Sequence, residues 1–161
     1  LEFRRVLFRS GLAAEGKRTL LAVNATPQPT GAMIRVSVTS PATITQSELE
    51  QAIRHGRQAE LLQSVHEEFA SRFPSMMARA GVTVSDISPP QFVTVAERPA
   101  MLITYRRTSA VDGALWEVRL YQIAADNQTI ELTLSNRISD RTTWIPILDR
   151  TLDTFAIRRA T

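Results

Sequence analysis

The sequence lacks cysteine altogether, in a chain of 161 residues. Without thiols the protein can form no disulfide framework, no cysteine-ligated metal centre, no CxxC redox site and no cysteine nucleophile. It also lacks long apolar runs: no stretch of about 18 apolar residues occurs, so the sequence predicts no transmembrane helix. Apolar residues still make up 43% of the chain, which excludes a wholly disordered protein. At this length a single domain is expected.

The first ten residues differ from the rest. Leu1–Ser10, LEFRRVLFRS, begins without Met and resembles the in-frame translation of a common short-read sequencing adapter. The resemblance implies a non-native segment, a metagenomic bacterial source and a true N-terminus outside the given sequence. A genuine basic amphipathic lead-in is the alternative. We expect residues 11–161 to form the single domain.

This segment also decides the charge argument. The whole chain carries 19 Lys and Arg against 16 Asp and Glu, a net charge of +3. The segment holds three Arg and one Glu, so the remainder has 16 basic and 15 acidic residues and a net charge of +1. A charge so near zero gives poor steering toward nucleic acid or anionic lipid. The doublets Arg106-Arg107 and Arg158-Arg159 lack interleaved aromatics, and we interpret them as solvated ends of a strand and a helix.

The strongest helix pattern begins at Thr45. Thr45 and Glu48 fit a capping box, and the predicted helix runs from there to Pro74, with a bend expected at the weak helix former Gly56. A further turn or two can follow Pro74, with Gly81 as its C-cap. The apolar stripe of this helix consists of Leu49, Ile53, Leu62, Val65, Phe69 and Phe73.

Strand patterns flank this helix. The predicted strands cover 17–25, 32–39, 82–87, 91–96, 100–108, 114–124 and 128–135. A last helix is predicted from about residue 140 or 142 to Phe155, with a stripe of Trp144, Leu148, Leu152 and Phe155 and with Pro146 in its first turn.

The strand around Val118 is apolar on both faces. Trp116, Val118 and Leu120 point to one side, and Tyr121 and Ile123 point to the other. A strand of this kind lies in the middle of a sheet that is covered on both sides. The sequence therefore predicts an α+β fold, a three-layer α/β/α sandwich with a mainly antiparallel central sheet. Trp116 and Leu132 are predicted to lie in its core.

The second half of the chain resembles the PsbP-like superfamily, which includes DcrB-type bacterial domains. The likeness rests on a "gRpa" strand at Arg98–Tyr105, the strand that contains Trp116, a strand at Ile130–Ser135 and the closing helix at Trp144–Phe155. Glu97 stands where the "gRpa" turn usually has glycine. The resemblance implies an α/β/α sandwich and accessory roles. It implies no shared catalytic site, so no functional residue carries over.

Motifs for phosphate, zinc or acyl-transfer chemistry are incomplete. Gly11, Gly16 and Lys17 approach a P-loop, but Arg18 replaces the required Ser or Thr and a strand follows instead of a helix. His66 begins a zincin-like run that lacks its second histidine, and His55 is three turns away. No Gly-x-Ser-x-Gly occurs. We therefore expect no metal, no cofactor and no catalytic residue among these motifs.

Paired carboxylates are harder to judge, because distance along the chain says nothing about distance in space. Glu117 and Glu131 lie on adjacent predicted strands. We expect each to be a surface residue paired with an arginine such as Arg119 or Arg106. Acid–base chemistry would need one raised pKa, which a sequence cannot show.

These observations favour a non-enzymatic accessory or protein-binding module of a bacterial protein. It would present to another protein either a surface or the groove between the sheet and the long helix. The surface is expected on the solvent side of that helix, with Arg54, Arg57, Glu60 and Glu67, together with nearby hairpin tips. Two alternatives stay open: a small enzyme with an Asp, Glu and Arg site, and an envelope carrier of a small apolar ligand. An envelope or periplasmic location is slightly favoured over the cytoplasm.

Deleting residues 1–10 should leave the temperature of thermal unfolding unchanged, because an adapter-derived segment has no reason to pack on the fold. Circular dichroism melts of the full and shortened chains measure this. A drop of more than a few degrees would show that the segment is real structure.

Overall fold

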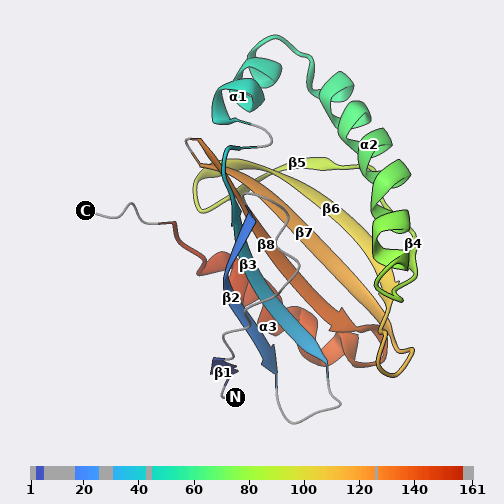
Figure 1. Cartoon of the computed structure of the whole chain (residues 1–161). Helices are drawn as coiled ribbons and strands as arrows, with labels where there is room; N and C mark the ends of the chain where they lie inside the picture. The colour runs from blue at the N-terminus through green and yellow to red at the C-terminus, as the bar shows by residue number, and fades with distance from the viewer. Residues whose placement is uncertain (1–2, 6–16, 26–30, 43–44, 126, 158–161) are drawn as a thin grey trace.

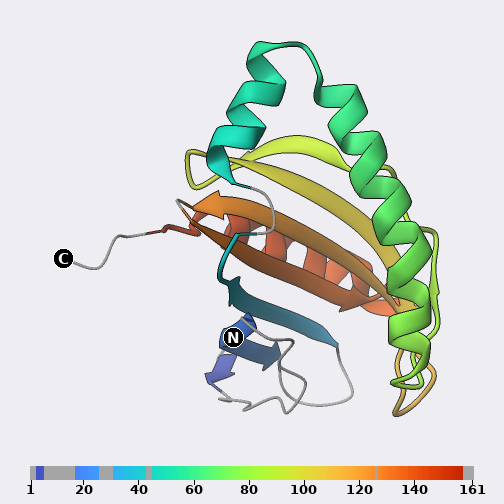
Figure 2. The same cartoon turned by 45° about the horizontal axis from the view of Figure 1, so that its top comes forward.

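The computed structural model describes residues 3–5, 17–25, 31–42, 45–125 and 127–157. Its strands form one antiparallel sheet in the order β1-β2-β3-β8-β7-β6-β4, and β5 also pairs with β6. Helices α1 and α2 cross one face, and α3 covers the other (Figures 1 and 2). This confirms the predicted α+β three-layer sandwich.

The strands are β1 (Phe3–Arg5), β2 (Lys17–Ala25), β3 (Ala32–Thr39), β4 (Val84–Ser85), β5 (Gln91–Val95), β6 (Arg98–Thr108), β7 (Leu115–Ala125) and β8 (Gln128–Arg137). The helices are α1 (Gln46–Arg54), α2 (Gln58–Ala78) and α3 (Arg141–Asp153), and a 3₁₀ turn at Ile138–Asp140 leads into α3.

The predicted long helix is in fact two helices. The capping box is confirmed, since the backbone N–H of Glu48 donates to the Thr45 hydroxyl and the N–H of Thr45 donates to the Glu48 carboxylate. These bonds also lower the pKa of Glu48. Gly56, at φ +66°, then ends α1 completely. The N–H groups of Gly56 and Arg57 donate to the carbonyls of Ile53 and Ala52, which is the Schellman pattern.

Two prolines lie inside helices. The sequence predicted Pro74 at the end of the long helix and Pro146 in the first turn of the last helix. Pro74 does not end the helix, because α2 continues to Ala78. Phe73, just before the proline, is held by its stacking on Phe69, and a second Schellman pattern at Gly81 closes the chain beyond it. Pro146 is the sixth residue of α3, because that helix already begins at Arg141.

The predicted strand over 82–87 is also shorter than expected, and only Val84 and Ser85 pair with β6. Asp86 has φ +52° and turns the chain out of the ladder. Ser88 then returns to β6, with its N–H donating to the Thr104 carbonyl at 2.8 Å.

The core between the sheet and α3 is a cluster of apolar side chains. Leu132 and Leu134 of β8 and Ile123 of β7 are fully buried, as are Leu148 and, nearly, Trp144 of α3. Leu132 thus lies where the sequence placed it. Burial of such side chains contributes roughly 1.5–3 kcal/mol each.

Ion pairs fasten α3 to β7 around this core. Arg119 contacts Asp149 at 2.5 Å, and Glu117 contacts Arg141 at 3.6 Å. The expectation that Glu117 pairs with an arginine is confirmed, but the partner is Arg141 of the C-terminal helix. The arginines named as examples contact other residues, Arg119 with Asp149 and Arg106 with Asp86.

On the opposite face, α1 and α2 lie over β6 and β7. Leu49 of α1 packs with Met101 and Ala124, joined by Leu61, Leu62 and Val65 of α2. Farther along, Phe69 and Phe73 of α2 pack on Tyr105, with ring centroids 6.0 and 5.0 Å away. Trp116 lies on this face as predicted, but it is only half-buried, because it sits near the end of β7 and outside these clusters.

The strand β1 adds three residues to the edge of the sheet, pairing Phe3–Arg5 with Val23–Ala25. Residues 1–2 and 6–10 of the adapter-like segment lie outside the described residues. The origin of the segment stays a prediction, and the deletion experiment measures what the β1 pairing contributes.

The β5–β6 hairpin turns through Ala96 and Glu97, whose φ angles are +49° and +62°. Positive φ at both central residues is the type I′ turn, which favours glycine at the second position. Glu97 holds the position at which the PsbP-like pattern usually has glycine.

Glu97→Gly should therefore stabilise the protein. A side chain in the left-handed region costs about 1–2 kcal/mol, and the greater unfolded-state freedom of glycine offsets about half of that. We expect a gain of about 0.5–1 kcal/mol in the free energy of unfolding by urea. Glu97→Ala, which keeps the Cβ, is the matched control and should give no gain; equal gains for both variants would contradict the turn-strain explanation.

Candidate functional site

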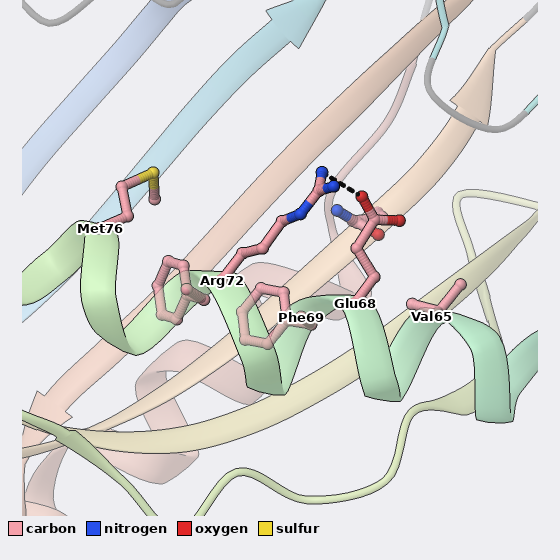
Figure 3. Close-up of a pocket in the computed structure, with 7 residues that line it drawn as sticks. Val65, Glu68, Phe69, Arg72 and Met76 are labelled. Carbon is pink, nitrogen blue, oxygen red and sulfur yellow. Dashed lines mark hydrogen bonds and ion pairs between the residues drawn. The ribbon is translucent and has the colours of Figure 1, made fainter.

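A groove lies between α2 and the sheet. It has a volume of about 480 Å³ and is lined by Val65, Glu68, Phe69, Arg72, Phe73 and Met76 of α2 and by Gln122 of β7. The labelled side chains follow one another along a single side of α2 (Figure 3). Most of the lining is apolar, so the groove can bind an apolar group, while its few polar groups can fix an orientation.

The sheet face beside the groove changes from apolar to polar across the strands. Cross-strand partners share a face, so the register defines rows of side chains. One row runs from Met101 through Gln122 to Glu131 and Ser37. The next runs from Ile103 through Leu120 to Thr133 and Arg35. The groove therefore lies at the boundary where apolar contacts with α2 give way to the polar side chains of β8 and β3.

The helix side of the groove carries a charged pair at its rim. Arg72 and Glu68 are one turn apart and contact each other at 3.0 Å, and their side chains are 80% and 67% exposed. Met76, on the next turn, is 57% exposed although it is apolar. A wall with this much solvent exposure belongs to an open groove rather than to a closed cavity.

α2 is unusual in having no fully buried residue. Its apolar side chains are half-buried, against Tyr105 at one end and Met101 at the other. Burial raises the pKa of Tyr105 to about 12, so its hydroxyl stays protonated at neutral pH. The apolar face of α2 is thus only partly covered by the sheet.

The surface predicted from the sequence lies at the α1–α2 corner and on the solvent side of α2, away from this groove. Arg54 ends α1, Arg57 follows the corner at Gly56, and Glu60 and Glu67 lie on α2, all of them exposed. Glu67 accepts a hydrogen bond from Gln63 at 2.6 Å. The first three residues cluster at the α1–α2 corner, and Glu67 lies two turns along α2. Their role in binding stays a prediction.

The carboxylates and histidines singled out in the sequence do not come together in one site. Glu117 faces α3, whereas Glu131 lies on the α2 side, because their register partners Asn136 and Gln122 fall on opposite faces. His55 caps α1 and His66 belongs to α2, so the two histidines occupy separate helices. Within the part of the chain that the structure describes, no three His, Asp or Glu residues are grouped closely enough to hold a metal ion.

The P-loop candidate falls mostly outside the described residues, since only Lys17 is described, at the start of β2. Arg158 and Arg159 are likewise outside them. Arg107 corrects the interpretation of the other doublet as solvated, because its guanidinium is half-buried and lies 5.1 Å from the centre of the Trp116 ring. None of the described helices is both long and apolar enough to cross a membrane.

The sequence indicated a groove between helix and sheet but not which residues line it. Val65, Phe69 and Phe73 were assigned to the apolar stripe of the helix, and they do pack on the sheet. Met76 continues the same stripe beyond Phe73, because α2 runs through Pro74 to Ala78, whereas the predicted helix ended at Pro74.

Comparisons with known proteins bear on the fold. The sequence matches no protein-family model and no curated protein. Among solved structures, PA94 from Pseudomonas aeruginosa, a protein of unknown function described as a candidate regulator, is similar at a TM-score of 0.52 and 13% identity, over 98% of this chain and 99% of its own. LpqN of Mycobacterium tuberculosis, which is involved in cell envelope biogenesis, is similar at a TM-score of 0.52 and 10% identity, over 98% of this chain and 91% of its own. At these identities the likeness concerns the fold alone.

Proposed function

We propose that this protein is a non-enzymatic binding module that receives an apolar segment of another protein in the groove between α2 and β7. One observation carries the proposal: Met76 is 57% exposed on a groove wall whose helix buries no residue completely. Docking a partner there would remove this apolar surface from water, which is the main driving force of association.

The open form of the groove favours a protein segment over a small ligand. Small-molecule sites enclose most of their ligand, whereas protein interfaces combine an apolar centre with a polar, solvent-exposed rim. Phe69, Phe73 and Met76 would supply the centre, and the pair Glu68 and Arg72 would supply the rim. The alternative occupant of the groove is a small apolar ligand, and the test must distinguish it from a protein segment.

The surface around Arg54, Arg57, Glu60 and Glu67, on the solvent side of α2 and at the α1–α2 corner, would give the partner a second contact apart from the groove. These residues carry two charges of each sign, so they would set orientation rather than attract a partner of one sign. In this proposal the binding unit is the domain of residues 11–161, and residues 1–10 are adapter-derived.

We further propose that the protein acts in the bacterial envelope and belongs to the PsbP-like superfamily. The involvement of LpqN in cell envelope biogenesis supports the location. The order of strands and helices and the "gRpa" strand after the Ala96–Glu97 turn support the superfamily. Glu97 in this turn departs from the superfamily pattern, which usually has glycine at that position.

Site-specific cross-linking tests the occupant. A photoreactive phenylalanine analogue at position 76 should capture a protein from cells of the source organism, and the linked peptide should map to one segment of it. The same analogue at position 143 is the matched control, because Thr143 is exposed on α3, on the opposite face of the sheet. A small apolar molecule bound instead, seen by native mass spectrometry, would contradict the proposal.

The captured partner, once purified, allows the affinity to be measured. Met76→Glu should weaken binding at least tenfold, because it places a charge in the apolar contact, a change worth about 1.4 kcal/mol or more. Thr143→Glu adds the same charge to an exposed position on α3, on the opposite face of the sheet, and should change the dissociation constant less than twofold. Equal effects of the two variants, or no effect of Met76→Glu, would show that the groove is not the interface.

A further inference from the structure

Three hydrogen-bonding groups on the α2-facing side of the sheet lack partners. Trp116 Nε1, Ser135 Oγ and Arg137 Nε are buried and make no hydrogen bond. They are neighbours in the sheet, because Trp116 pairs with Arg137 across β7 and β8, and Ser135 lies two residues before Arg137 on the same face. Folded proteins leave few buried polar groups unsatisfied, so three at adjacent positions call for an explanation.

Arg107 completes the cluster from β6. It is the register partner of Trp116, and its guanidinium lies 5.1 Å from the centre of the indole ring. Burial lowers its pKa. In the ranges that the structure describes, no carboxylate contacts Arg107, although its neighbour Arg106 contacts Asp86 and Arg137 contacts Asp112. The guanidinium of Arg107 is therefore half-buried against the Trp116 ring and has no carboxylate partner. Burying a charge without an ionic partner lowers the stability of the fold.

We propose that Arg107, Trp116, Ser135 and Arg137 form a binding site for an oxyanion, that is, for a carboxylate or phosphate group. The guanidinium groups and the indole N–H can only donate hydrogen bonds, and the serine hydroxyl can do so. An oxyanion offers only acceptors and a negative charge, so it would satisfy the orphaned groups and the charge of Arg107 together.

The position of Trp116 is fixed by its surroundings. A Cβ added at Gly31 would lie 2.5 Å from indole Cη2 and 2.8 Å from the Arg137 side chain. The ring therefore rests against a backbone that only glycine can provide, between Arg107 and Arg137. Such packing holds the donors in place before the anion arrives, which lowers the cost of binding.

This site is distinct from the groove proposed as the protein-binding site. Arg107 pairs with Val84 of β4, which contacts the end of α2, so the cluster lies at the end of the sheet where α2 finishes. It shares no residue with the groove lining. It can exist whether or not the groove receives a partner.

Nuclear magnetic resonance of the full chain tests the site through its two indole N–H signals. Inorganic phosphate and acetate are titrated separately, at constant ionic strength maintained with sodium chloride, and Trp116→Phe assigns the signals. We expect the Trp116 signal to shift saturably, while the signal of Trp144, which is buried between α3 and the opposite face of the sheet, stays still. Saturation by phosphate alone would identify a phosphate site, and saturation by acetate as well would include carboxylates.

Matched arginine variants decide which residue is responsible. Arg107→Gln should weaken anion binding at least tenfold. Arg106→Gln removes the adjacent arginine, which lies on the opposite face of β6, and should leave binding within twofold. Should Arg107→Gln fail to fold, Arg107→Lys keeps the charge without the planar fork and should still weaken binding. No saturable shift with either anion, or equal losses at positions 106 and 107, would overturn the proposal.

Discussion

The alternation of side chains along β7 is the constraint from which the two cores and the groove follow. Val118 and Leu120 must fill the core under α2 while Tyr121 and Ile123 fill the core under α3. A shift of the register by one residue would exchange the two faces and ruin both cores at once. At Gln122 the α2-facing series turns polar, and there α2 and the sheet leave the groove instead of a packed contact.

Much of the fold could be predicted because periodicity is a local property. The alternation in β3 and β7, the capping box at Thr45 and the stripe of α3 each lie within one segment, and each is confirmed. Helix ends were predicted less well, because they depend on competition between local preference and packing. Gly56 ends a helix outright, since its backbone bonds close a Schellman pattern, whereas Pro74 does not, since aromatic contacts hold the turns around it.

The candidate site could be predicted only in outline, because it depends on contacts between distant segments. The sequence indicated a helix over a sheet, and hence a groove, but not that α2 lies over β6 and β7. Nor could it show that Glu117 and Glu131 face opposite ways, which requires knowledge of the register. Arg107 looked like one half of a solvated doublet. Only the pairing of β6 with β7 places it over Trp116.

The helix α2 has a further consequence for the dynamics of the molecule. No residue of α2 is completely buried, and a glycine with positive φ lies on each side of the helix, Gly56 before it and Gly81 after it. α2 can therefore separate from the sheet as a cooperative unit without breaking any strand pairing. Such segments belong to the low-free-energy end of local opening. Its amide hydrogens would exchange with solvent sooner than those of β7 and β8. The width of the groove would then be set by a fluctuation that the sheet itself does not share.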